Sequence, residues 1–146
     1  MIPPMISSDA PPGERQVFER LASDPLADDW ITLHSLALAE HIRQTQGEAD
    51  FVIIVPGHGV AVIEVKSHTK VARLPDGRWQ LGRHPPTGRG PFQQANEEMH
   101  SIRGYLRAQG ADLRAIPLVS GVWFTHVRAR EFNNAVLPFL VSHTPA

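Results

Sequence analysis

The sequence contains no cysteine among its 146 residues, so disulfide bonds and metal sites with thiolate ligands are excluded. No apolar run approaches the length of a membrane span, and residues 1–12 lack the basic start and apolar centre of a secretory signal. Zinc signatures, nucleophile elbows and glycine-rich phosphate loops are also missing from the sequence. These absences predict a cytoplasmic protein whose chemistry depends on other residue types.

The residues that are present are sufficient for one domain. A chain of this length with 42% hydrophobic residues can bury a core of its own, which argues against disorder. Residues 1–12 contain four prolines and few apolar anchors, so we expect a flexible N-terminal tail followed by a single domain over residues 13–146. No obvious closing element precedes the final residues, and we therefore expect the N-terminal part of a longer protein.

The charged residues are distributed unevenly along the chain. Residues 1–66 contain four Lys/Arg and ten Asp/Glu, a balance of −6, whereas residues 67–146 contain ten Lys/Arg and five Asp/Glu, a balance of +5. An acidic region beside a basic one suits a site that holds a cation and then a polyanion. An unevenly charged, solvated surface would give the same numbers, so charge alone does not decide between these readings.

The hydrophobic periodicity predicts both helices and strands. Two Val/Ile-rich strands over residues 50–55 and 60–66, joined by a short Pro/Gly-containing turn, indicate an antiparallel hairpin. The other expected elements are helices over residues 13–23, 91–108 and 131–140, strands over residues 30–35 and 116–125, a short hairpin of residues 71–74 and 78–81, and a loop over residues 40–48.

Charged residues occur in the central hairpin only at the strand ends away from the turn. If Ile54 pairs with Val60, then Asp50 lies opposite Glu64, and both share a face with Lys66 because side chains alternate along a strand. A shift of one residue would move Asp50 to the other face. The hypothesis of a site therefore selects this register, and the register does not independently prove the site.

A divalent cation would explain why the two carboxylates of this hairpin lie together. Two carboxylates a few ångströms apart repel each other by about 3–4 kcal/mol at an effective dielectric constant near 20. A hard cation such as Mg²⁺ or Mn²⁺ between Asp50 and Glu64 removes that penalty, and the carbonyl of Val65 could supply a further oxygen ligand. Lys66 could then orient a water molecule for attack on a phosphodiester. A simple ion pair of Lys66 with either carboxylate remains the alternative.

Other residues could complete such a site. Glu14 lies on the apolar side of the first predicted helix, and Gln94 lies in the first turn of the helix over residues 91–108. Each has an alternative reading, since carboxylates at helix starts are favoured by the helix dipole and a single glutamine is usually a surface residue. Four arginines could bind phosphates or be solvated: Arg83, Arg89, Arg103 and Arg107.

Five segments, in a fixed order, carry a resemblance to a known family. They are Gly13-Glu14-Arg15-Gln16-Val17-Phe18, Gly47-Glu48-Ala49-Asp50-Phe51, Ile63-Glu64-Val65-Lys66, Asp76-Gly77-Arg78-Trp79 and Pro91-Phe92-Gln93-Gln94-Ala95. With these segments the chain resembles the nuclease-related domain (NERD) family, a branch of the PD-(D/E)xK nuclease superfamily. The order of all five segments is much more specific than the short Glu64-Val65-Lys66 motif alone.

The resemblance implies an α/β fold with a restriction-endonuclease-like αβββαβ core, in which helices flank a mixed central sheet. It implies Asp50 and Glu64 as metal ligands, Lys66 as the catalytic lysine, Glu14 as the helix carboxylate and Gln94 as the active-site glutamine. All five positions carry the expected residue type.

Two hypotheses of function follow. The first is a Mg²⁺-dependent nuclease domain that hydrolyses phosphodiester bonds in DNA, with RNA not excluded. The alternative is a catalytically silent nucleic-acid-binding or partner-docking module of a larger, helicase-like protein, since members of the family are often joined to helicase, kinase or zinc-binding regions. The sequence leaves the oligomeric state open.

Overall fold

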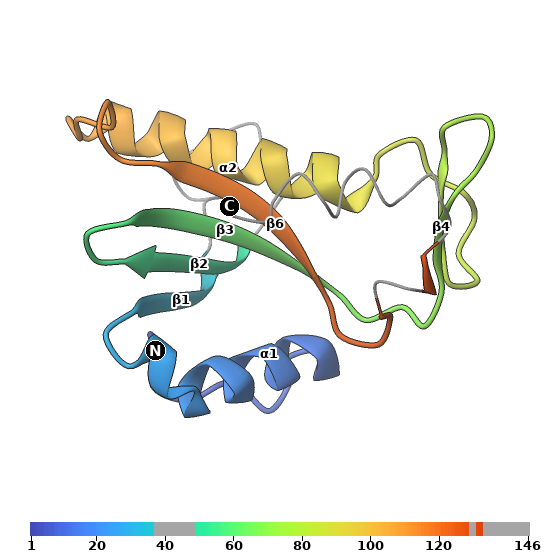
Figure 1. Cartoon of the computed structure of the whole chain (residues 1–146), viewed down its shortest axis with the longest axis horizontal. Coiled ribbons are helices and arrows are strands. Elements are labelled where there is room, and N and C mark those ends of the chain that lie inside the picture. Colours follow the sequence, from blue (N-terminus) through green and yellow to red (C-terminus); the bar gives the residue numbers. More distant parts are fainter. Residues whose placement is uncertain (37–48, 129–130, 133–146) are drawn as a thin grey trace.

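The computed structural model describes residues 1–36, 49–128 and 131–132 (Figure 1). In chain order the elements are α1 (Pro12–Ser23), a short 3₁₀ helix η1 (Pro25–Ala27), β1 (Ile31–Leu36), β2 (Ala49–Val55), β3 (Gly59–Lys66), β4 (Val71–Arg73), β5 (Trp79–Leu81), α2 (Pro91–Ala108) and β6 (Leu118–Phe124). Apart from the β4–β5 insertion, this is the predicted αβββαβ order.

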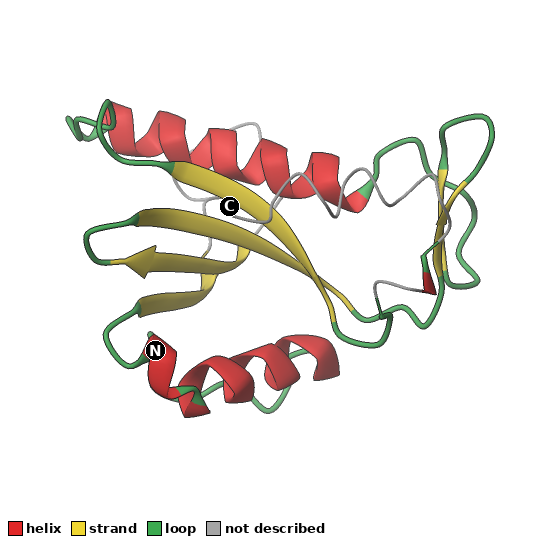
Figure 2. Ribbon diagram, viewed as in Figure 1, coloured by secondary structure: helices red, strands yellow, loops and turns green. Residues whose placement is uncertain are grey.

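The central sheet is mixed and lies between two helices. Its strand order is β1-β2-β3-β6, with antiparallel pairing from β1 to β3 and parallel pairing between β3 and β6. Helix α1 covers one face of the sheet and α2 covers the other (Figure 2). The parallel pair follows from α2, which carries the chain back across the sheet before β6 begins. The predicted restriction-endonuclease-like fold class is confirmed.

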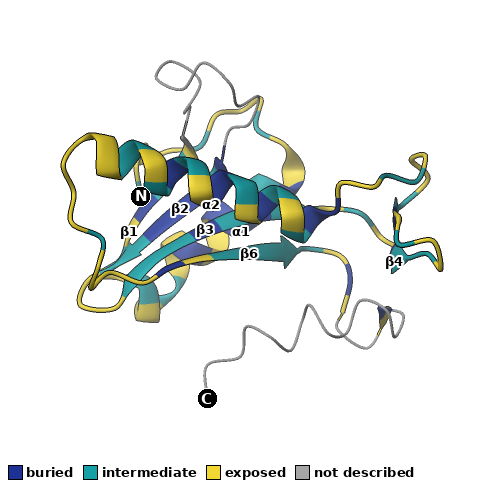
Figure 3. Ribbon diagram, turned by 90° about the horizontal axis from the view of Figure 1, so that it is seen from above, coloured by how far each residue is buried: buried dark blue, intermediate teal, exposed yellow. Residues whose placement is uncertain are grey.

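Alternation along the strands divides the core into two layers. On the α2 side, Val52 and Val62 pack against Met99 and Ile102 of the helix. The alternate residues of β2, Phe51 and Ile53, face α1, and Phe51 is completely buried there. Figure 3 shows buried residues along β2 and exposed residues on the outer side of α2. Both faces of the central hairpin are therefore covered, as its nearly continuous apolar sequence predicted.

The register of the central hairpin is largely as predicted. Ile54 pairs with Val60, which puts the chain in the frame that the site hypothesis required. The ladder ends at Phe51, however, so the expected backbone pair of Asp50 with Glu64 is not formed. Instead, the backbone N–H of Val65 in β3 donates to the side chain of Asp50 and not to a main-chain carbonyl of β2.

The predicted peripheral hairpin is also present. Strands β4 and β5 form a two-stranded sheet of their own, which lies apart from the central sheet beyond one end of α2 (Figure 1). Gly77 has a φ of 84° in the connecting turn, a conformation that glycine adopts without strain. Trp79 is 5% exposed and packs against Phe92 of α2, so the hairpin is anchored to the start of that helix.

The N-terminal segment contacts the sheet at one point that the sequence did not reveal. The N–H of Ile2 donates to the carbonyl of Thr32 at 2.7 Å, and the N–H of His34 donates to the carbonyl of Ile2 at 2.9 Å. The expectation of a flexible tail over residues 1–12 did not include this attachment to β1.

Two other expectations lie largely or wholly outside the described residues. These are the loop over residues 40–48 and the helix over residues 131–140, of which only residues 131–132 are described. Within the described part of the chain, no helix has the length and apolar character needed to cross a membrane.

Candidate active site

Strand β3 directs Glu64 and Lys66 to the α2 side of the sheet, because they are two residues apart on an alternating strand. The Lys66 ammonium donates to Oε1 of Glu64 at 2.5 Å, and the two side chains are only 16% and 5% exposed. Removing both charges from water is expensive, and the desolvation can outweigh the attraction between them. A buried pair of this kind is poor evidence for stability and better evidence for a site.

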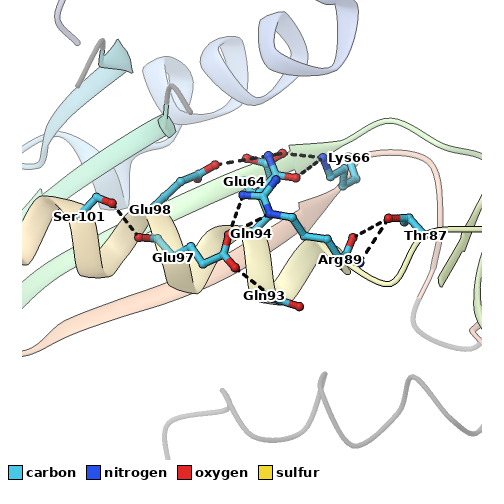
Figure 4. A network of polar contacts seen from close by, with 9 residues as sticks. All are labelled: Glu64, Lys66, Thr87, Arg89, Gln93, Gln94, Glu97, Glu98 and Ser101. Atoms are coloured by element: carbon cyan, nitrogen blue, oxygen red, sulfur yellow. Dashed lines mark hydrogen bonds and ion pairs between the residues drawn. The ribbon is translucent and has the colours of Figure 1, made fainter. Parts of the chain in front are cut away.

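Helix α2 supplies the amide that joins this pair. Oε1 of Gln94 accepts a hydrogen bond from the Lys66 ammonium at 3.2 Å, and its Nε2 donates to Oε1 of Glu64 at 2.7 Å. Glu98, one turn further along α2, also accepts from Nε2 of Gln94, at 3.3 Å. These four side chains meet between β3 and α2 (Figure 4). The geometry thus brings together two predicted elements 28 residues apart in sequence.

Asp50 reaches the same region from β2. Its Oδ2 accepts a hydrogen bond of 2.7 Å from the backbone N–H of Val65, which lies between Glu64 and Lys66. The pKa of Asp50 is raised to about 7, mainly by burial and also by the charges of Glu64 and Glu14, while the N–H of Val65 and the ammonium of Lys66 oppose the shift. The carboxylates of the predicted site are therefore close enough to repel one another.

Glu14 approaches from the first turn of α1. Gly13 allows this approach, since a Cβ at that position would overlap the Ser67 side chain at the end of β3. Glu14 accepts a hydrogen bond of 2.7 Å from Nε2 of His34, and both side chains are largely buried, at 14% and 6% exposed. Sequence reasoning missed His34 as a partner, because the two residues are 20 positions apart and on different elements.

The comparison with protein families agrees with this arrangement. The family model described as the nuclease-related domain, NERD, matches residues 11–125. The chain belongs to the nuclease-related domain family. Neither the curated proteins nor the solved structures contain a significant match. The match spans every described helix and strand, so the fold and the family agree over the same part of the chain.

Glu98 is a second residue of this nuclease-related domain that the sequence reasoning overlooked. It is 3% exposed, and burial together with the charges of Glu64 and Asp50 raises its pKa to about 8. The amide of Gln94 opposes this shift. A signal was available, since position 98 falls on the buried stripe of α2 together with positions 95, 99 and 102. A carboxylate on such a stripe needs a physical reason.

The donor set suits a hard divalent cation. Oε2 of Glu64 and Oε2 of Glu98 are buried and have no hydrogen-bond partner among the described residues. Within residues 1–36, 49–128 and 131–132, no three His, Cys, Asp or Glu side chains are arranged to hold a metal ion. Mg²⁺ does not need such a cage, because it is usually bound by one or two carboxylates and completes its shell with water and substrate oxygens. Asp50 and Glu64 therefore fit this ion.

Of the four predicted arginines, Arg103 and Arg107 lie on α2, and Arg83 and Arg89 lie in the segment between β5 and α2. Arg83, Arg89 and Arg107 are exposed, and Arg103 is half-buried on α2. Arg89 forms an ion pair with Glu97 at 2.8 Å, so it is already neutralised in part. Their role in binding nucleic acid stays a prediction.

Proposed function

We propose that this nuclease-related domain hydrolyses phosphodiester bonds in DNA with the help of Mg²⁺. The observation that carries this proposal is the contact of the Lys66 ammonium with both Glu64 and Gln94 in a largely buried position. Asp50 and Glu14 lie close enough to that group for their charges to affect one another. A surface ion pair would need no such surroundings.

Asp50 and Glu64 would hold the cation, with the carbonyl of Val65 as a further oxygen ligand and Mn²⁺ as a substitute ion. When bound, the cation would neutralise the carboxylates, lower the pKa of a coordinated water and stabilise the negative charge that develops on the phosphate. The raised pKa of Asp50 supports this assignment, because burial and the nearby charge of Glu64 disfavour its ionised form and a bound cation would offset that cost.

Lys66 would orient the attacking water and share its proton. If Glu64 bound the cation, the ammonium of Lys66 would still have Oε1 of Gln94, which accepts a hydrogen bond from it. Gln94 thus holds the amine beside the water, and Glu14, fixed by His34, adds a carboxylate from the α1 side. Arginine is a poor substitute for Lys66, since a planar guanidinium is larger and does not give up its proton.

The exposed side chains suggest how the polymer would be held. Arg83, Arg89, Arg103 and Arg107 would bind the phosphate backbone and would not read bases, in keeping with the salt-dependent contacts that most such arginines make. Arg83 follows the β4–β5 hairpin and makes no hydrogen bond or ion pair with a described residue, unlike Arg89. Its guanidinium is therefore available to bind a phosphate.

The test is cleavage of supercoiled plasmid, single-stranded DNA and single-stranded RNA with Mg²⁺ or Mn²⁺, and with a chelator as the metal-free control. We expect DNA cleavage that is lost in Lys66→Ala and Asp50→Asn. Arg114→Ala is a suitable control, because among the described residues Arg114 pairs only with Asp112 and its side chain is 90% exposed. Activity that survives both site substitutions would refute the assignment of these residues.

One observation favours a second candidate, a silent nucleic-acid-binding module. The ammonium of Lys66 binds Oε1 of Glu64, so this buried carboxylate has a counter-ion from the chain itself. This candidate predicts DNA binding that weakens with salt, does not depend on Mg²⁺ and leads to no cleavage. A neighbouring domain, such as a helicase, would then supply the activity of the whole protein.

A further inference from the structure

The side chain of Glu98 has an unusual position for a carboxyl group. It lies on the sheet-facing side of α2 and is 3% exposed, with Oε1 bound to Gln94 and Oε2 without a described hydrogen-bond partner. In the same layer, α2 buries only apolar residues such as Ala95, Met99 and Ile102. An apolar side chain at position 98 would avoid the desolvation of a carboxyl, so packing alone does not explain a glutamate there.

The contacts of Gln94 indicate what this glutamate does. A side-chain amide has one acceptor and two N–H donors, and here the oxygen meets the Lys66 ammonium while the nitrogen meets carboxyl oxygens of Glu64 and Glu98. Rotating the amide by 180° would turn its N–H groups towards the ammonium and its oxygen towards two carboxyl oxygens. The orientation is thus set by the acceptors on the nitrogen side (Figure 4).

The two acceptors differ in the number of hydrogen bonds that they accept from described residues. Oε1 of Glu64 accepts from both Lys66 and Gln94, and in the proposed reaction Glu64 also binds the cation. Glu98 makes no described hydrogen bond other than the one to Gln94. If Glu64 held a cation, Glu98 would remain as an acceptor for the amide nitrogen of Gln94.

We propose that Glu98 is a positioning residue that fixes the side-chain amide of Gln94, with its oxygen towards Lys66 and its nitrogen away from it. The kinetic part of this inference rests on the proposed hydrolysis, whereas the orientation of the amide does not. Glu98 would not touch the substrate, and its effect would reach the reaction only through Gln94 and Lys66.

The first experiment observes the amide directly by NMR of ¹⁵N-labelled protein, without any need for activity. The side-chain N–H₂ signals of Gln94 are identified by their loss in Gln94→Leu. Glu98→Leu should move both signals towards the values of a solvated amide, and Glu98→Gln, which retains Oε1, should restore them. Glu98→Asp, which withdraws the acceptor by one methylene, should behave like Glu98→Leu and provides a second variant if the leucine variant does not fold.

The second experiment is a double-mutant cycle on DNA cleavage. Glu98→Leu should lower kcat about tenfold to a hundredfold with little change in KM, which is the range for groups that orient a catalytic residue from behind. In the Gln94→Leu background the same change should have no further effect, because the amide that it positions is gone. Glu19→Leu, on the exposed side of α1, is the matched control and should leave kcat unchanged.

The outcomes separate this inference from the proposed function. Unchanged Gln94 signals in folded Glu98→Leu or Glu98→Asp, or independent effects of Glu98→Leu and Gln94→Leu on kcat, would overturn it. If the protein cleaves no nucleic acid under any condition, the proposed function fails, and the NMR measurement alone decides the role of Glu98.

Discussion

Replacing Asp50 with asparagine should make the metal-free domain more stable at alkaline pH. The substitution keeps an oxygen that can accept from the N–H of Val65 and removes only the charge. The pKa of Asp50 is raised from 3.8 to about 7, so the folded state binds a proton more tightly than the unfolded state does. Stability contributed by that proton is present below about pH 4 and is lost as the pH rises through about 7.

The size of the effect follows from the shift. The difference of about three pKa units corresponds to about 4 kcal/mol at 1.36 kcal/mol per unit. Asp50 is partly exposed and its titration depends on Glu64, so we reduce this to about 2 kcal/mol. For a domain of this size, 1 kcal/mol moves Tm by about 2–4 °C, and Asp50→Asn should therefore raise Tm at about pH 9 by roughly 4–8 °C.

The assay is thermal unfolding of wild type and Asp50→Asn at about pH 4, 7 and 9, with and without Mg²⁺. The two proteins should have similar Tm values at the lowest pH and separate as the pH rises. Mg²⁺ should stabilise the wild type at about pH 9 and have little effect on the variant, because the ion binds the ionised carboxylate. Asp112→Asn, at an exposed site, is the control. A wild type that is the more stable protein at about pH 9 without metal would refute this reasoning.

Two further predictions concern the surface and the packing. Arg83→Ala should reduce the slope of log K for DNA against log salt by about 0.9, as expected for one lost phosphate contact, whereas Arg114→Ala should leave the slope unchanged; equal effects would place the nucleic acid elsewhere. Gly90→Ala should lower the free energy of unfolding by about 1–3 kcal/mol in urea titrations, because its Cβ would overlap the buried indole of Trp79. A neutral Gly90→Ala would show that Trp79 can move.

Local sequence patterns predicted the elements that depend on neighbouring residues. The proline at position 91 marks the start of α2, whose observed range of Pro91–Ala108 is the predicted one. The Val/Ile-rich strands predicted the central hairpin, and the site hypothesis selected its frame, in which Ile54 pairs with Val60. Glu64 and Lys66 could be placed together because a strand puts alternate residues on one face.

Contacts between distant elements could not be predicted in the same way. The Asp50 carboxylate bonds to the main chain of β3 instead of standing opposite Glu64, which depends on where two twisted strands separate. His34 meets Glu14 because α1 covers the face of the sheet on which His34 lies, and Glu98, a neighbour of Gln94 along α2, comes close to Glu64 because α2 lies over β3. Such contacts depend on the position and angle at which each helix packs on the sheet. The hydrophobic periodicity of a single segment does not specify that packing.

The position of the β4–β5 hairpin in the chain has an evolutionary consequence. The hairpin connects Lys66 to the helix that carries Gln94, yet it builds a separate small sheet and leaves the β1-β2-β3-β6 order intact. As long as Trp79 packs against Gly90 and Phe92, the turn between β4 and β5 can change length or charge without disturbing Lys66 and Gln94. Related domains can thus vary this turn while keeping the arrangement of Lys66 and Gln94.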